Sequence, residues 1–419
     1  MKTTSANRTF PIAMMFALFF IIAFVTGLQN PMGVIIKSQF QTSHLLSQLG
    51  NLANFIAYAF MGIPAGWMLG RIGYKRTSLT AIAVGLLGVV IMWLSGRSGQ
   101  YGLYLTGAFV SGFSMCMLNT VVNPMLKTLG RDTRQGNQLI QFGGAFNSIG
   151  ATLAPILVGY LMGSNEALRT IGRANPALYI AMAIFAVTFV VIAFARIPEP
   201  HLQPASADRT APAPRLLRIR HFALGLIAIF LYVGTEVGIP NIANLFMTQE
   251  LHMDASVAGT IVGTYWLLML VGRLLGGAIG NRISVHTMLA FTASLGLVLV
   301  GLFMLFSHTD LTVALPVFRS DFSFGTEPIR LGLVFLILCG LATSVMWGAI
   351  FSLATTGLGQ ATAQASGIFM TMVCGGGILP ALQAWIADRT SFTASFGLVL
   401  LCLAYLLFYA LRGYRPASR

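Results

Sequence analysis

Charged residues are scarce in this sequence. They make up 9% of the 419 residues, and only 11 of them are acidic, against 25 lysines and arginines. A chain that is 56% hydrophobic cannot cover a normal water-facing surface with so few charges. The net charge of +14 does not indicate nucleic-acid binding, because no polar stretch is long enough to fold as a separate basic domain. We therefore expect most of the surface to face lipid.

Motifs for cofactors and metals are also missing. The chain has no GxxxxGK[ST] segment, so it lacks this phosphate-binding loop. The four cysteines lie in apolar runs without paired spacing, and the six histidines lie at the ends of such runs or in loops. We expect no disulfide framework, no metal site, no cofactor beyond a coupling Na⁺ or H⁺, and no enzymatic activity.

Long apolar runs recur along the whole chain, and crossing a bilayer takes roughly 20 such residues in a helix. The runs lie near residues 10–36, 47–70, 77–96, 101–125, 138–162, 176–196, 221–247, 255–280, 286–307, 331–358, 365–387 and 394–411. The sequence predicts an all-α membrane protein with twelve transmembrane helices in two pseudo-symmetric six-helix halves. The halves are residues 1–196 and 221–419, and a Pro- and Ala-rich connector, 197–220, joins them.

The basic residues are unevenly divided between the two sets of loops. If the N-terminus is inside, the inner loops and the tail hold more Lys and Arg than the outer loops, so the positive-inside rule places both termini in the cytoplasm. Three acidic residues, Asp310, Asp321 and Glu327, fall in the longest outer loop, where we expect solvated charge. We expect a monomer in a bacterial inner membrane, surrounded by lipid and without a nucleic-acid partner.

One loop motif carries a family resemblance. GWMLGRIGYKR, residues 66–76, resembles the loop motif of the major facilitator superfamily, except that Gly70 stands where an acidic residue is usual. A second Gly/Arg loop, GNRIS at 280–284, lies roughly 210 residues later and supports two parallel repeats. Two such halves predict alternating access to a central site.

Six further segments resemble the fucose, glucose and galactose permease group of that superfamily. They are VVNPMLKTLG (121–130), FNSIGA (146–151), LYVGTEVGI (231–239), YWLLMLVGRLLGG (265–277), MWGAIFSLATTGLG (346–359) and GGGILPALQAWIADRTS (375–391). The resemblance implies the major facilitator fold and import of a neutral hexose or related sugar by cation symport, through a polar cavity between the halves.

The chain departs from the fucose permease at two acidic positions. The first-span stretch 27–40 has no acid where that permease carries an aspartate, and Asn119 stands where its fourth span carries a glutamate. Glucose-type members have an amide at the second position. The missing first-span acid favours sodium coupling or uniport over simple proton symport.

One carboxylate, Glu236, lies well inside a predicted span. An ionisable group there is costly, so we expect it to bind a cation or proton or to accept a sugar hydroxyl, with a structural hydrogen bond or ion pair as the alternative. Gly234, Gly238 and Pro240 are expected to loosen its helix. Arg273 is its natural partner, or else anchors a gate near the cytoplasmic end.

Another basic residue, Lys37, lies toward the outer end of the first span. It either snorkels to the interface or faces inward, where it would favour an anionic substrate.

Amide side chains suit a sugar site, because each offers a donor and an acceptor without burying charge. Aromatic faces suit the C–H side of a sugar ring. Any one of these residues could instead only bridge helices. The candidates for solute binding are Gln29, Asn30, Asn119, Asn123, Gln141, Asn147, Asn241, Asn244, Tyr265, Trp266, Trp347 and Gln383.

The sequence as a whole predicts a secondary transporter that imports a sugar-like small molecule by alternating access. Efflux of amphipathic compounds remains an alternative, as does a non-transporting membrane sensor or receptor.

Overall fold

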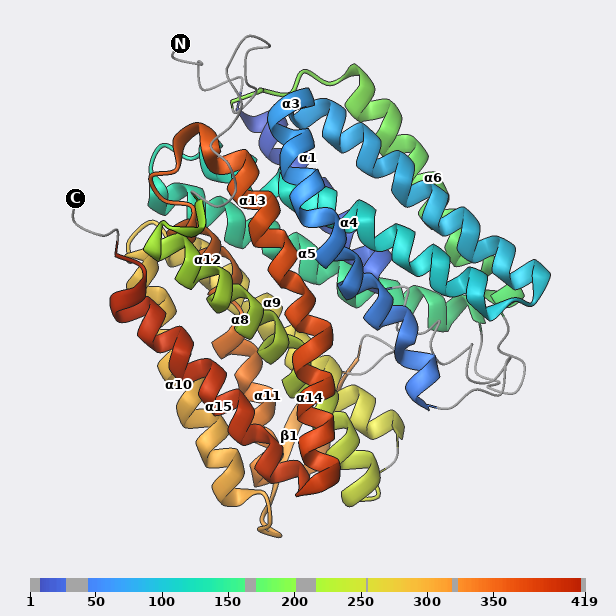
Figure 1. The fold of residues 1–419 in the computed structure, drawn as a ribbon. Helices are drawn as coiled ribbons and strands as arrows, with labels where there is room; N and C mark the ends of the chain where they lie inside the picture. Colours follow the sequence, from blue (N-terminus) through green and yellow to red (C-terminus); the bar gives the residue numbers. More distant parts are fainter. Residues whose placement is uncertain are drawn as a thin grey trace. The chain divides into compact units, whose positions relative to one another are not determined.

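The computed structural model describes residues 8–27, 44–162, 171–200, 216–253, 255–318 and 323–415 (Figure 1). This described part is almost entirely helical and contains one two-stranded hairpin. Gln29, Asn30 and Lys37 lie outside the described residues, as does most of the predicted connector.

The first predicted half forms long helices. They are α1 (Thr9–Gly27), α3 (His44–Ser98), α4 (Tyr101–Leu129), α5 (Thr133–Met162) and α6 (Ile171–Phe194). Helix α3 contains the second and third predicted spans, and they are separated at Gly73, whose φ of 82° and ψ of 177° are not helical. Glycine adopts a positive φ without steric cost, which explains this residue in the loop motif.

The second predicted half is more often interrupted. Its elements are α8 (Arg220–Leu245), η3 (Phe246–Glu250), α9 (Ala255–Ile279), α10 (Val285–Phe306), β1 (Thr312–Phe318), β2 (Phe324–Arg330), α11 (Leu331–Thr343), α12 (Met346–Ala354), η4 (Gly359–Ala361), α13 (Thr362–Thr371), η5 (Met372–Cys374), α14 (Gly375–Arg389), α15 (Phe392–Phe408) and η6 (Tyr409–Gly413). The tenth predicted span is thus α11 followed by α12, and the eleventh is α13 followed by α14.

Ten described segments are long and apolar enough to cross a membrane. One of them, 52–98, covers two predicted spans, and the 30-residue α5 supplies the remaining one. Large apolar side chains on these helices are exposed, including Phe194 at 86%, Leu305 at 72% and Leu401 at 71%. Such surface is favourable in lipid and unfavourable in water.

Contacts divide the chain into two compact units. The first comprises Met1–Arg131, Phe146–Ala213 and Gly357–Cys374, and the second comprises Asp132–Ala145, Pro214–Thr356 and Gly375–Arg419. The start of α5 therefore groups with the later helices, and α13 groups with the earlier ones. The two predicted halves were defined by a repeat in the sequence, and this grouping by spatial contacts does not test that repeat.

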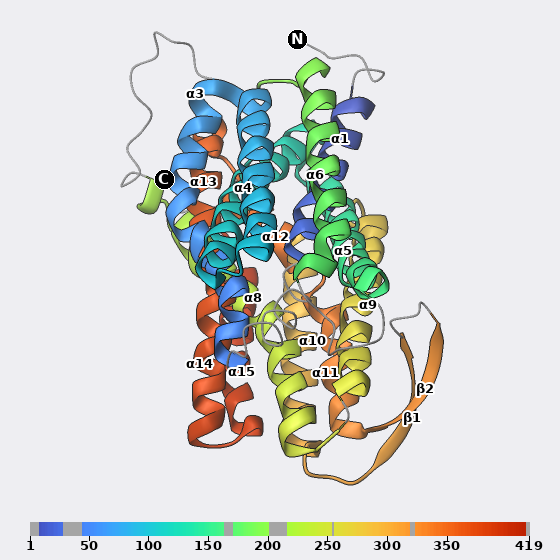
Figure 2. The same ribbon diagram turned by 90° about the vertical axis from the view of Figure 1, so that its right-hand side faces the viewer.

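In the first unit, α3 packs on α4, α6 and α13, and α1 packs on α4 (Figure 2). The contact between α3 and α13 is very close at two glycines. A Cβ added at Gly66 would lie 2.9 Å from the Cα of Gly367. Small residues allow helix backbones to approach in this way within a bilayer.

The loop inside α3 binds a carboxylate from a distant part of the chain. The backbone N–H groups of Tyr74 and Lys75 donate to the two carboxylate oxygens of Glu199, the second over 3.0 Å. Burial raises the pKa of Glu199, and the two N–H bonds together with Arg76 and Lys75 oppose the increase. Gly70 replaces the usual acid of the motif, and Glu199 supplies a carboxylate to the same loop.

In the second unit, α8 contacts α12, α14 and α15, while α10 contacts α11 and α15. An aromatic cluster fills the space near the end of α10. The ring of Phe303 lies 5.8 Å from that of Phe246 and 4.6 Å from that of Phe396, measured between centroids. These three side chains are essentially inaccessible to solvent, so they form part of the core of this unit.

The longest predicted outer loop contains the antiparallel hairpin of β1 and β2, which contacts α9 and α11 (Figure 2). Arg330 lies 3.4 Å from Asp310, whose side chain is 92% exposed. This exposed pair agrees with the expectation of solvated charge, while Asp321 lies outside the described residues.

Candidate functional site

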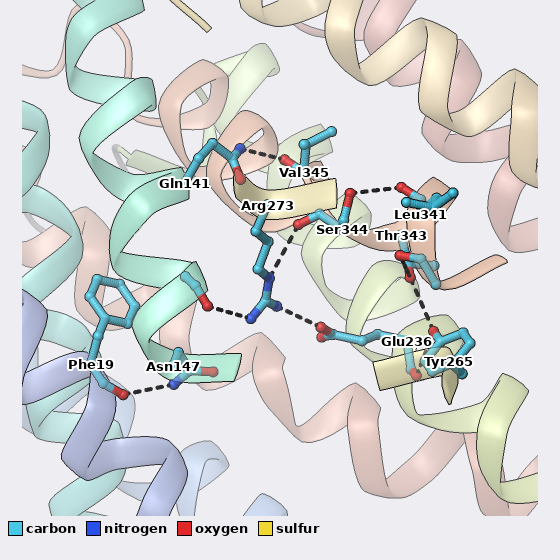
Figure 3. Close-up of polar contacts among 12 residues, drawn as sticks. Phe19, Gln141, Asn147, Glu236, Tyr265, Arg273, Leu341, Thr343, Ser344 and Val345 are labelled. Atoms are coloured by element: carbon cyan, nitrogen blue, oxygen red, sulfur yellow. Dashed lines mark hydrogen bonds and ion pairs between the residues drawn. The ribbon is translucent and has the colours of Figure 1, made fainter. Parts of the chain in front are cut away.

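A buried ion pair joins α8 and α9. Nη2 of Arg273 lies 2.9 Å from Oε1 of Glu236, and the exposed fractions of the two residues are 8% and 9% (Figure 3). The pairing predicted for Arg273 is therefore present in the structure. Two opposite charges that are paired avoid much of the cost that each would pay alone in an apolar interior.

Arg273 also donates to two backbone carbonyls from other parts of the unit. Nη1 donates to the carbonyl of Gly144 on α5 over 2.9 Å, and Nε donates to the carbonyl of Ser344 over 3.3 Å (Figure 3). One guanidinium thus connects α5, α8, α9 and the junction between α11 and α12. Arginine suits this role because its donors form a rigid planar fork.

The junction between α11 and α12 provides acceptors because the helix is interrupted there. α11 ends at Thr343 and α12 begins at Met346. The carbonyls of Ser344 and Val345 accept hydrogen bonds from Arg273 and from Nε2 of Gln141, the latter over 2.8 Å. The carbonyl of Val345 also accepts the backbone N–H of Ala349 over 3.2 Å, so it bonds both to α12 and to Gln141. Backbone groups at a helix interruption within a membrane need partners of this kind.

Glycines on α9 allow this helix to approach the junction. A Cβ added at Gly272 would lie 2.6 Å from the Cβ of Ser344, and one added at Gly276 would lie 3.5 Å from the Cβ of Val345. The GRLLGG segment therefore places the backbone of α9 against the junction and directs Arg273 between the neighbouring helices.

Helix α8 runs without interruption through Glu236, contrary to the loosening expected there. The two glycines that flank Glu236 face α14 instead. A Cβ added at Gly234 would lie 2.5 Å from the Cβ of Leu379, and one added at Gly238 would lie 2.6 Å from Oε1 of Gln383. These glycines serve close packing between α8 and α14, and the helix remains regular.

Two tyrosines lie beside Glu236 in the second unit, and each packs against a tryptophan. The hydroxyl of Tyr265 donates to the backbone carbonyl of Glu236 over 3.2 Å and lies 3.0 Å from the hydroxyl of Thr343. The ring of Trp266 packs edge-to-face on that of Tyr265, with centroids 5.3 Å apart. Trp347 packs edge-to-face on Tyr232, a turn before Glu236, at 6.5 Å.

The predicted amides of the first unit contact neighbouring protein groups. Nδ2 of Asn119 donates to the hydroxyl of Tyr58 over 3.0 Å, and Nδ2 of Asn123 donates to the carbonyl of Asn119 over 2.8 Å. Nδ2 of Asn147 on α5 donates to the carbonyl of Phe19 on α1 over 3.0 Å (Figure 3). These donors connect helices or turns, and a role in solute binding stays a prediction.

The remaining candidates differ in exposure. Gln383 is 2% exposed, and its Nε2 has no hydrogen-bond partner among the described residues. Asn241 is exposed and Asn244 is half-buried. A buried donor without a partner is costly, so Gln383 is the amide whose environment most favours an external acceptor.

The described residues contain no group of three or more His, Cys, Asp or Glu that could hold a metal. The cysteines are free, and all except Cys374 are buried.

Several contributors to the site could not be found in the sequence. Ser344 and Gly144 act through backbone carbonyls, which every residue has. Thr343 and Tyr232 lie beside the pair but belong to residue types that are common in membrane helices. Only the interruption of a span near Ser344 could have indicated free carbonyls, and no proline marks that interruption.

Membrane-spanning helices that bury an ion pair are typical of secondary transporters. The family model of the Major Facilitator Superfamily matches residues 15–381, and the chain belongs to this superfamily. Its members are transporters, so the predicted fold class and the absence of an enzymatic role are confirmed.

Comparison with individual proteins gives similarity along nearly the whole chain. The chain is 30% identical to a glucose/galactose transporter of Brucella abortus, over 98% of this chain and 96% of that one. It is 25% identical to the L-fucose-proton symporter of Escherichia coli, over 98% and 94%. A crystal structure of the transporter FucP in its outward conformation has a TM-score of 0.80 at 22% identity, covering 96% and 98% of the two chains.

Proposed function

We infer that the protein imports a neutral sugar, most closely a hexose, by alternating access. The carrying observation is the 30% identity to a glucose/galactose transporter across almost the full length of both chains. The proposed location is a bacterial inner membrane with both termini in the cytoplasm. The bacterial relatives support the membrane, and the distribution of basic residues supports the orientation.

The chemistry of the second unit supports a neutral solute. Glu236 and Arg273 compensate each other's charge, so they leave no net charge to attract an ionic substrate. Gln383 has a buried amide donor without a partner among the described residues, and Trp266 and Trp347 are only half-buried. An amide donor and aromatic faces are the groups that a sugar ring requires.

Coupling to a cation is assigned to Glu236. A proton or Na⁺ that binds its carboxylate competes with Arg273 for the same oxygens. Cation binding would weaken the 2.9 Å ion pair between Glu236 on α8 and Arg273 on α9. Arg273 would keep its bonds to the carbonyls of Gly144 and Ser344. Cation binding would thereby change how strongly α8 is held, which is the differential interaction that coupling requires.

The test is uptake of labelled hexoses, amino sugars and acidic sugars into proteoliposomes with sodium and proton gradients imposed separately. Saturable uptake of a neutral hexose driven by one gradient supports the proposal and identifies the ion. Uptake without dependence on either gradient would support uniport and remove the coupling role of Glu236. If no sugar is transported under any condition, the proposed substrate class is wrong.

The coupling role has a separate test. Glu236→Gln should retain exchange of sugar across the membrane but should no longer concentrate it. The matched control, Glu250→Gln, removes an exposed carboxylate and should accumulate sugar like the wild type. If Glu236→Gln is too unstable to purify, the double variant Glu236→Gln/Arg273→Gln tests the same point without leaving a buried charge. Undiminished accumulation by either variant refutes the coupling role.

A further inference from the structure

A cavity of about 250 Å³ lies at the ends of several helices of the second unit, away from the ion pair. It opens where α5 and α10 begin and where α12 and η6 end. The polar and aromatic residues that line it are Thr133, Arg134, Ser284, His286, Thr356 and Tyr414. The cavity is several times larger than the roughly 30 Å³ that a water molecule occupies in the liquid, so it can hold a polyatomic group.

The surroundings of this cavity are strongly basic. The described segments 131–135, 282–286 and 412–415 contain five arginines and one acidic residue. That acid, Asp132, uses one carboxylate oxygen to accept the backbone N–H of Gln135 over 2.8 Å at the start of α5. Arg134 on the wall is exposed, so its guanidinium is accessible to a ligand from solution or from the membrane surface.

The walls are rigid on one side and rich in hydroxyl groups on the other. The rings of His286 and Tyr414 stack with centroids 4.7 Å apart and an angle of 8° between their planes. Thr133, Ser284 and Thr356 contribute hydroxyl groups. The hydroxyl of Thr356 donates to the carbonyl of Ser352 over 2.7 Å, and that of Ser284 bonds to Thr287 as the cap of α10. The carbonyl of Thr356 is held 3.0 Å from Nε2 of His221, which fixes the end of α12 against α8. The first turns of α5 and α10 add the positive ends of two long helices.

We propose that this cavity binds a phosphate ester. An arginine fork, a histidine and the hydroxyl of Thr133 match the oxygens of a phosphate better than they match a neutral group. The aliphatic side chains of Val285 and Leu353 complete the wall and suit the organic part of the ester. Two sources share this chemistry: the headgroup of an anionic phospholipid, and a soluble sugar phosphate.

The experiment measures thermal unfolding of the full-length protein. Samples in a non-ionic detergent receive inorganic phosphate, glucose 6-phosphate, or sodium chloride at equal ionic strength. A parallel set uses nanodiscs of phosphatidylcholine with and without phosphatidylglycerol. We expect a saturable increase in Tm with at least one phosphate-bearing probe and no comparable increase with sodium chloride.

Arg134→Gln should raise the half-saturating concentration of the active probe at least tenfold. The control Arg389→Gln removes an exposed arginine that stacks on Trp385, elsewhere in the same unit, and should respond like the wild type. A response to glucose 6-phosphate or phosphate in detergent assigns the soluble ester, and a response only to phosphatidylglycerol assigns the lipid. The proposal is overturned if no probe exceeds sodium chloride, or if Arg389→Gln loses as much response as Arg134→Gln. This test does not depend on which solute the protein transports.

Discussion

Replacing Glu236 should destabilise the protein more than replacing Arg273, although the two residues form one ion pair. Glu236→Gln keeps an amide oxygen beside Arg273 but removes the negative charge that faces a guanidinium which cannot lose its proton. Removing one partner from a buried pair costs about 3–5 kcal/mol, because the remaining charge is uncompensated.

Arg273→Gln leaves a carboxylate, which can bind a proton and so avoid a buried charge. The loss then approaches the value of charged hydrogen bonds, about 1.5–3 kcal/mol. The double variant Glu236→Gln/Arg273→Gln buries no charge and should be more stable than Glu236→Gln alone. The difference between the double variant and the sum of the single variants measures the coupling within the pair.

The assay is thermal unfolding of the purified variants in one detergent at one pH, with Glu250→Gln and Arg389→Gln as exposed controls near the wild-type Tm. Glu236→Gln should have the lowest Tm of these variants. The reasoning is refuted if Arg273→Gln is the less stable single variant, or if the losses of the two single variants simply add in the double variant.

Three further predictions concern close packing and the α3 loop. Gly272→Ala should lower the free energy of unfolding by about 1–3 kcal/mol, because its Cβ would meet Ser344. Gly301→Ala on α10, where a Cβ has open space around it, should raise that free energy by about 0.5–1 kcal/mol. Equal changes of Tm in the two variants would refute this. Gly367→Val should destabilise the first unit, because the larger side chain forces α13 away from α3. A pair of cysteines placed across this contact should then cross-link less readily in the variant than in the wild-type background. Unchanged cross-linking would refute this prediction. The raised pKa of Glu199 means that the folded protein holds this proton more tightly than the unfolded chain does. The stability difference between wild type and Glu199→Gln should therefore fall as the pH rises above the ordinary glutamate value, and a difference that increases with pH would contradict this sign.

Much of the architecture follows from the sequence because each step depends on local composition. A run of apolar residues long enough to cross a bilayer must satisfy its own backbone, so hydropathy alone indicated the spans. Glu236 was found because a lone carboxylate in such a run has few alternatives to a functional or paired role. Gly234 and Gly238 were noticed because they flank Glu236, but they were expected to loosen the helix, and their close packing on α14 was not predicted.

Only the tertiary structure decided which groups meet. Glu236 and Arg273 are 37 residues apart on different helices, and the carbonyls of Gly144 and Ser344 carry no mark in the sequence. Glu199 reaches a loop 125 residues earlier in the chain. The amino-acid sequence determined that the protein spans a membrane as a helical transporter and which rare charges it must accommodate there. The packing of those helices determined the partners of each charge, because a side chain's partner depends on distances that span many residues and on which backbone groups the helices leave free.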